Sequence, residues 1–127
     1  MKADGHVAWI DLTVPDAPAL RDFYARVLGW THAEVDMGGY ADFNMNDPAS
    51  GETVAGICHR RAGNADLPPA WIVYFPVTDL DRSLALVLAG GGTEVSPVRT
   101  AGDARYVIVR DPAGAVFALL TNHGRSG

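Results

Sequence analysis

Two stretches of the chain, residues 9–14 and 72–77, alternate their side chains in the manner of a strand, and each leads into a segment with helical spacing. Each is followed by an aspartate, Asp16 or Asp79, whose carboxylate can accept hydrogen bonds from the unpaired amides of a helical first turn. The first helix, over about residues 17–28, is predicted to bury one apolar stripe made of Leu20, Phe23, Val27 and Leu28. The second is predicted to bury Leu80, Leu84, Val87 and Leu88 and to end at glycines 90–92.

Three shorter strands are predicted to follow each helix. They fall over about 31–36, 39–46 and 52–58 in the first half of the chain, and over about 93–98, 105–110 and 115–121 in the second. The order β-α-β-β-β therefore occurs twice, which makes the predicted fold class α+β.

Matching residues at a constant spacing indicate that these two halves arose by tandem duplication. Val14 and Asp16 recur 63 residues later as Val77 and Asp79. We predict a single domain over residues 1–127, with a first module at about 7–59, a linker at about 60–69 and a second module at about 70–121.

The helix of each module can cover only one face of its strands, so the alternation along each strand predicts which side chains face away from the helix. Ile10, Leu12 and Val14 are uniformly apolar and are assigned to the helix side. The opposite face mixes aromatic with polar side chains, which is the lining that a small-molecule pocket needs. The predicted ligand-binding residues are Trp9, Thr13, Asp42, Asn44, Ile72, Tyr74, Tyr106, Ile108, Arg110 and Ala118. The alternative is that this face is a packed interface between modules or subunits.

Asp11 is the candidate catalytic residue on this face. A carboxyl group that is partly desolvated has a raised pKa, which suits a general acid or base. The alternative interpretation is structural, with Asp11 paired to Arg110 or another basic residue and only holding strands together.

The composition of the chain indicates which kinds of binding partner to expect. A net charge of −5 argues against a nucleic-acid binder, which normally carries a basic surface. Cys58 is the one cysteine, so no intrachain disulfide can form, and a free thiol fits the reducing cytoplasm. No apolar run approaches the length of a membrane span, so we expect a cytoplasmic protein without a membrane partner.

The chain resembles the vicinal oxygen chelate superfamily over roughly residues 7–121. The resemblance is carried by the repeat, by Val14-Pro15-Asp16 leading to Leu28-Gly29-Trp30, and by the closing segment from Asp111-Pro112 to Leu119. This group contains glyoxalase I, extradiol dioxygenases and the fosfomycin- and bleomycin-resistance proteins. The resemblance implies paired β-α-β-β-β modules that form a cupped, partly open mixed barrel, commonly in homodimers.

Metal-using members of this group place ligands at four equivalent positions. This chain has Trp9, Ile72 and Ala118 at three of them, and Val54 or Gly56 at the fourth. Metal sites need several converging N, O or S donors, which these side chains lack. The scattered histidines are predicted to lie at the surface, and they are His6, His32, His59 and His123. We therefore predict no metal and no other cofactor.

The leading functional hypothesis is a metal-independent, glyoxalase- or bleomycin-resistance-like protein that binds a small organic molecule as a homodimer. Three alternatives stay open. The chain could be a lyase or isomerase that uses Asp11 as acid or base, a metal-dependent glyoxalase- or dioxygenase-like enzyme with ligands that the pattern misses, or a purely structural dimer.

Overall fold

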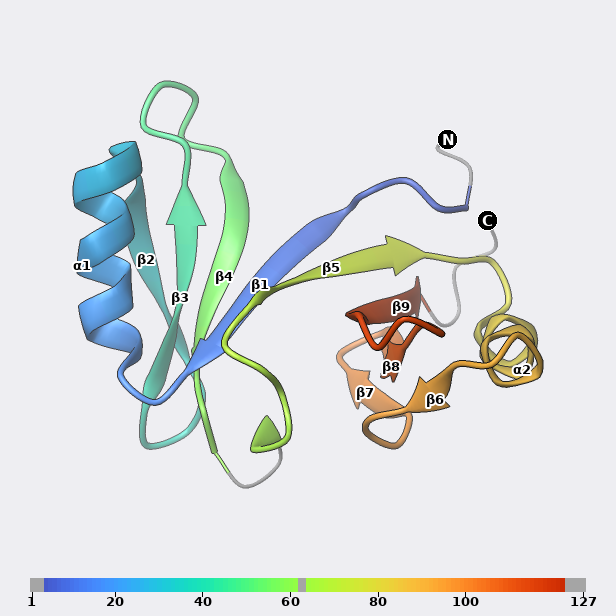
Figure 1. The fold of residues 1–127 in the computed structure, drawn as a ribbon. Coiled ribbons are helices and arrows are strands. Elements are labelled where there is room, and N and C mark those ends of the chain that lie inside the picture. Colours follow the sequence, from blue (N-terminus) through green and yellow to red (C-terminus); the bar gives the residue numbers. More distant parts are fainter. Residues whose placement is uncertain (1–3, 62–63, 123–127) are drawn as a thin grey trace. The chain divides into compact units, whose positions relative to one another are not determined.

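The chain forms two compact units. Residues 9–71 make up one, called the N-terminal unit here, and residues 1–8 with 72–127 make up the other, the C-terminal unit. The computed structural model describes residues 4–61 and 64–122. Each unit is described by itself (Figure 1).

The N-terminal unit contains one helix and a mixed sheet. Its elements are β1 (Trp9–Val14), α1 (Ala17–Leu28), β2 (Thr31–Asp36), β3 (Ala41–Asn46) and β4 (Thr53–His59). The strand order is β2-β3-β4-β1, in which β1 runs parallel to β4 and the other two pairs are antiparallel. Helix α1 lies along one face of this sheet (Figure 1).

Helix α1 begins and ends as its sequence predicts. The Asp16 carboxylate accepts a hydrogen bond from the Ala19 amide at 3.1 Å, which confirms the predicted N-cap. Gly29 ends the helix with a φ of 76°, a left-handed conformation that glycine adopts without steric cost.

The buried face of α1 differs from the predicted stripe. Ala17, Leu20 and Tyr24 pack on the core, whereas Phe23, Val27 and Leu28 are exposed by 49%, 59% and 49%. Of the predicted stripe, only Leu20 faces the sheet. Tyr24 takes the inward position because its ring packs against two tryptophans, with its hydroxyl accepting a hydrogen bond from the Trp71 indole at 3.1 Å. The predicted side of β1 is correct, since Ile10, Leu12 and Val14 all belong to this core.

The C-terminal unit repeats this arrangement. Its elements are β5 (Trp71–Pro76), α2 (Leu80–Ala89), β6 (Thr93–Glu94), β7 (Arg99–Ala101), β8 (Ala104–Arg110) and β9 (Val116–Asn122), of which Trp71 belongs to the N-terminal unit. The strand order is β5-β9-β8-β6, with β5 parallel to β9 and with β7 paired to β8. The α+β class is therefore confirmed, and the β-α-β-β-β order recurs with the strand after α2 divided into β6 and β7.

One predicted strand is interrupted. Residues 93–98 were expected to form a single strand, but β6 covers only Thr93–Glu94 and β7 begins at Arg99. Pro97 lies between them and has no amide hydrogen to donate to a neighbouring strand. The amides of Val95 and Ser96 both point to the Ile108 carbonyl, at 2.8 and 3.3 Å, so the regular ladder is already lost there.

The core of the C-terminal unit lies between α2 and its sheet. Leu80, Val107, Val109 and Leu119 are buried, and Leu84, Val87 and Phe117 pack against them. Leu88 was predicted to join this core but is 50% exposed. Among the described residues, no helix is long and apolar enough to cross a membrane.

Candidate functional site

In each unit, the register of the sheet places three residues of neighbouring strands in one row, and the rows of the two units occupy equivalent positions in the repeat. In the N-terminal unit, Asp11 of β1 lies beside Gly56 of β4, which lies beside Asn44 of β3. In the C-terminal unit, the corresponding row is Tyr74 of β5, Ala118 of β9 and Ile108 of β8. Paired residues share a sheet face, and these rows occupy the face opposite the helix. Two of these three positions are therefore polar in the N-terminal unit and aromatic or apolar in the C-terminal unit, and the third is a small residue in both.

Asp11 is held in one place by Trp9 and by the absence of a side chain at position 56. The Trp9 indole donates a hydrogen bond to the Asp11 carboxylate at 2.5 Å. A Cβ added to Gly56 would collide with the Asp11 carboxylate oxygen and would come within 3.2 Å of the Trp9 ring. Glycine at position 56 therefore lets the carboxylate and the indole lie directly over strand β4.

A second polar row follows this one along the same face. Thr13, which is 3% exposed, lies beside Cys58, and the Cys58 thiol hydrogen-bonds to Asp42. Burial raises the pKa of the Cys58 thiol strongly, and the nearby Asp11 and Asp42 carboxylates raise it further. The thiol therefore stays protonated and is a poor nucleophile.

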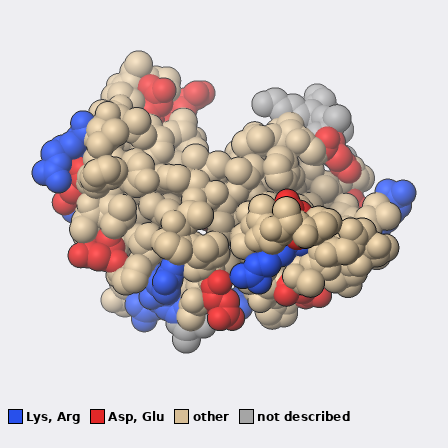
Figure 2. Space-filling view, in the orientation of Figure 1, with Lys and Arg blue, Asp and Glu red and all other residues tan. Residues whose placement is uncertain are grey.

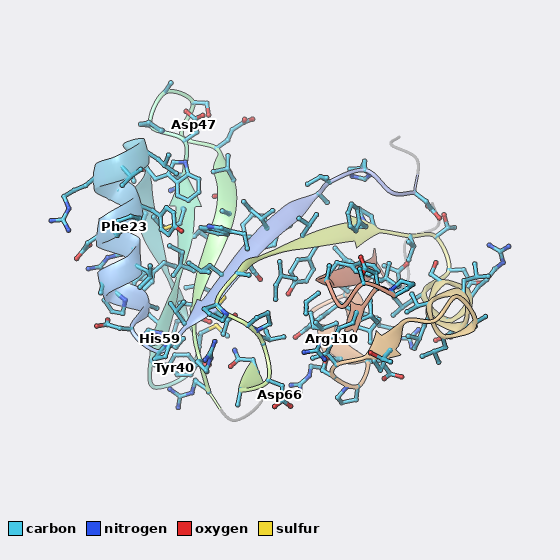
Figure 3. All side chains as sticks on the ribbon, in the orientation of Figure 1. Phe23, Tyr40, Asp47, His59, Asp66 and Arg110 are labelled. Atoms are coloured by element: carbon cyan, nitrogen blue, oxygen red, sulfur yellow. The ribbon has the colours of Figure 1, made fainter. Side chains whose placement is uncertain are left out.

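Asp42 also contacts His59, which was predicted to lie at the surface and is partly exposed, with a side-chain exposure of 23%. Its carboxylate oxygen accepts from the His59 amide at 2.9 Å and lies 3.3 Å from the imidazole Nδ1. The edge of the Tyr40 ring meets the imidazole, and the Arg61 guanidinium lies 3.7 Å from the centre of the Tyr40 ring. Tyr40 and His59 lie side by side at one end of the N-terminal unit (Figure 3).

The other histidines differ in their surroundings. His32 is exposed, as predicted, with its ring against that of Phe43. His6 is half-buried and interacts with other residues. His123 lies outside the described residues.

The helix-opposite face of the C-terminal unit is mainly apolar and aromatic. Ile72, Ile108 and Ala118 are exposed by 3% or less, so they form the floor of this face and offer no open surface of their own. Tyr74 and Tyr106 are half-buried, with ring centres 6.2 Å apart and planes inclined at 53°. Arg110 is exposed at the end of β8 (Figure 3).

Sequence reasoning missed one residue of this face. Arg99 lies directly opposite Tyr106 in the β7–β8 pair, so their side chains leave the same side of the sheet. It was overlooked because residues 93–98 were assigned to one regular strand that stopped before it. The proline at position 97, which interrupts that strand, was the available signal.

The residues at the expected metal positions do not fit a metal ion. Because Asp11 pairs with Gly56 as Tyr74 pairs with Ala118, Gly56 and not Val54 is the equivalent of Ala118. The residues at the four positions are then Trp9, Gly56, Ile72 and Ala118. None of their side chains can donate a lone pair to a cation. Within the described ranges, no three His, Cys, Asp or Glu residues are grouped in a way that could hold a metal ion.

Comparison with known proteins identifies the family. Residues 5–119 match the family described as the Glyoxalase/Bleomycin resistance protein/Dioxygenase superfamily. The chain therefore belongs to this superfamily, as the resemblance found in the sequence implied.

Two relatives share about a third of their aligned residues with this chain. The anthracycline biosynthesis protein DnrV of Streptomyces peucetius is 35% identical over 133 residues, which cover 92% of this chain and 47% of DnrV. The putative glyoxylase CFP32 of Mycobacterium tuberculosis is 33% identical over 113 residues, covering 87% of this chain and 43% of CFP32. The chain thus spans about half the length of these relatives.

Solved structures support the same fold. Streptomyces coelicolor methylmalonyl-CoA epimerase aligns with a TM-score of 0.60 at 16% identity, over 97% of this chain and 100% of the epimerase chain. Glyoxalase I from Zea mays aligns with a TM-score of 0.64 at 16% identity, over 97% of this chain but 45% of its own. At these identities the likeness concerns the fold and carries no activity over.

Charged side chains of both signs are distributed over the face drawn in Figure 2. On the face drawn in Figure 2, Lys and Arg side chains are scattered among Asp and Glu, and the described residues form no continuous basic surface there. The candidate site is therefore assigned to the rows of the helix-opposite faces, where Asp11, Asn44, Tyr74 and Tyr106 lie.

Proposed function

We propose that this protein binds small organic molecules without the help of a metal ion, on the helix-opposite face of each unit taken by itself. The observation that carries the proposal is the fixed group of Trp9, Asp11 and Gly56. A carboxylate oriented by an indole occupies the place where metal-using relatives are expected to hold a ligand. Such a group offers a directed hydrogen-bond acceptor and an apolar ring, which together orient a small ligand.

The two units contribute different chemistry to this proposal. The N-terminal unit supplies Asp11 and Asn44, which the buried side chains of Thr13 and Asp42 support from the next row. The C-terminal unit supplies Tyr74, Tyr106 and Arg110. Ile72, Ile108 and Ala118 are proposed to support the ligand surface from beneath, because they are almost completely buried. The name of the relative DnrV, an anthracycline biosynthesis protein, supports an aromatic natural product as the kind of molecule to test first.

Ligand-induced thermal stabilisation tests this function. A molecule that binds only the folded state raises the unfolding temperature by mass action. We expect a hit in a panel of aromatic natural products and metabolites, with the same shift after treatment with EDTA. Asp11→Asn keeps the shape of the side chain and removes its charge, and we expect it to weaken binding about tenfold, as the loss of one charge-assisted hydrogen bond does. A panel without any stabilising compound, or a shift that disappears with EDTA, would contradict the proposal.

A second candidate function makes Asp11 the proton-transfer group of a lyase or isomerase. The observation in its favour is that the carboxylate is held in one orientation by the Trp9 indole. This candidate predicts that Asp11→Asn abolishes turnover of a bound compound while leaving most of its affinity. Turnover that survives the substitution would remove it.

We further propose that the protein is a homodimer of the cytoplasm. The dimer is supported by membership of the superfamily, whose members often form dimers. The cytoplasm is supported by the free, protonated thiol of Cys58.

A further inference from the structure

The face of the C-terminal unit that carries the two tyrosines also carries two arginines. Arg99 pairs with Tyr106 across β7 and β8, and Arg110 lies four residues after Tyr106 on β8. Side chains separated by an even number of residues on a strand share a face, so Tyr106, Arg99 and Arg110 project together. Tyr74 completes this group, with its ring 6.2 Å from that of Tyr106.

Arg99 differs from the other half-buried arginines of the described chain. The Arg21 guanidinium lies 2.9 Å from Asp22, that of Arg60 donates to the Leu67 carbonyl at 2.8 Å, and that of Arg105 lies 3.3 Å from Asp81. Arg99 is also half-buried, yet no hydrogen bond, carboxylate or aromatic ring among the described residues engages its guanidinium. The Arg99 guanidinium therefore has no counter-charge among the described residues and can pair with the carboxylate of a ligand.

The same face holds no carboxylate that could fill this role from its own strands. Glu94 is the one acidic residue on the described strands of the C-terminal unit, and it pairs with Val109. Val109 belongs to the core beneath α2, so Glu94 leaves the sheet on the helix side. The described strands of this unit therefore place two arginines and no carboxylate on the helix-opposite face.

We propose that this face selects an organic anion with a flat aromatic ring, an inference that rests on the proposed small-molecule function and names its ligand class. The carboxylate of the ligand accepts two parallel hydrogen bonds from the Arg99 guanidinium, whose planar fork matches a carboxylate. The aromatic ring of the ligand packs against Tyr74 and Tyr106, and Arg110 adds positive charge at the far end of β8. An uncharged molecule of the same shape keeps the ring contacts and loses the ion pair.

A pair of probes with one ring system tests this selectivity. Naphthoate and naphthamide differ by the charge of one substituent, and both are titrated by calorimetry at low salt. We expect naphthoate to bind at least tenfold more tightly than naphthamide. Arg99→Gln should bring the two affinities within about twofold of each other, and Arg99→Lys, which keeps the charge without the fork, should leave an intermediate preference.

Arg82→Gln is the matched control, because it removes the same charge from an exposed position on α2. We expect this variant to keep the full preference for naphthoate. Circular dichroism and unfolding midpoints near those of the wild type establish that each variant is folded.

The outcomes separate this inference from the function on which it rests. Equal affinity for the two probes in the wild-type protein, or a preference that survives Arg99→Gln, overturns the ligand class while leaving a small-molecule function in place. Failure of both probes, together with stabilisation by uncharged or cationic compounds from the wider panel, also overturns only the ligand class. Failure of every compound overturns both proposals.

Discussion

Gly56 controls the geometry of the candidate site at the scale of a single residue. The Asp11 carboxylate and the Trp9 ring both occupy the space into which a side chain at position 56 would extend. We expect Gly56→Ala to lower the free energy of unfolding by about 1–3 kcal/mol, because overpacking forces side chains away from their preferred positions. It should also weaken ligand binding, since the carboxylate must turn away. Urea denaturation and ligand titration measure the two effects.

A double-mutant cycle shows whether the collision with Asp11 is the cause. Removing the carboxylate by Asp11→Ala opens the space above position 56, so Gly56→Ala should cost clearly less in that background. An undiminished cost would assign the destabilisation to the backbone of β4 and contradict this account of the site.

The Cys58 thiol is expected to make the stability of the fold depend on pH. Its pKa is raised in the folded protein, so the folded state retains a proton that the unfolded thiol loses above about pH 8.5. The stabilisation from this group is therefore complete below that pH and is lost as the pH rises toward the folded pKa. Between pH 7 and pH 10 we expect the wild type to lose roughly 2 kcal/mol more stability than Cys58→Ser, whose hydroxyl can still donate to Asp42 but does not titrate.

The comparison of the two proteins isolates the thiol, because tyrosine and lysine residues titrate in both. Urea unfolding midpoints at several pH values give the two curves. Parallel curves would show that the thiol ionises as readily in the folded protein as in the unfolded chain.

At the residue scale, the sequence predicted which face carries the polar side chains but not how they interact. Alternation along β1 was enough to assign Asp11 to one side and Leu12 to the other. The hydrogen bond between Trp9 and Asp11 depends on side-chain rotamers and on the space above Gly56. The alternation of polar and apolar residues along the sequence predicts neither of these. The contact of Asp42 with His59 joins two strands, and only the register across them brings these residues together.

At the scale of the elements, the same N-cap begins both helices. The Asp79 carboxylate accepts from the Arg82 amide at 3.0 Å, as the Asp16 carboxylate does from Ala19 at 3.1 Å. We expect Asp16→Ala and Asp79→Ala each to lower the stability by about 1 kcal/mol, because an amide of the first turn loses its acceptor.

Serine at the same positions is the control, since its hydroxyl also accepts from the first turn. Chemical denaturation should place Asp16→Ser and Asp79→Ser within a few tenths of a kcal/mol of the wild type. Alanine variants as stable as the serine variants would show that these caps add nothing to the fold.

Element types and boundaries were predicted well where the signal is local. Both N-caps and the glycine at the end of α1 act through contacts within a few residues of the helix end, and both helices occur where these residues predict them. The buried side of α1 is not local, because the packing of Tyr24 against Trp30 and Trp71 decides it. The interruption between β6 and β7 depends on Pro97, whose missing amide outweighs the strand-forming residues around it.

At the scale of the whole molecule, duplication explains why one fold presents two kinds of surface. The two units share their strand order and their parallel outer pair, so each position in one has an equivalent in the other. Asp11 and Asn44 correspond to Tyr74 and Ile108, which means that the repeated backbone was kept while the side chains above it diverged. The sequence could reveal this duplication because the core and cap residues that specify the backbone still match.

At the same scale, the proposed homodimer fixes the number of chains that should be found in solution. We expect this chain to associate with a second copy of itself, as proposed above, because the symmetric dimer is the commonest homo-oligomer. Light scattering coupled to size-exclusion chromatography should therefore give twice the chain mass of 13.5 kDa. The mass should hold across a tenfold dilution and in EDTA, since no metal is proposed to bridge the chains. A mass equal to one chain at the concentrations where ligand binds would show that the site is complete in a single copy.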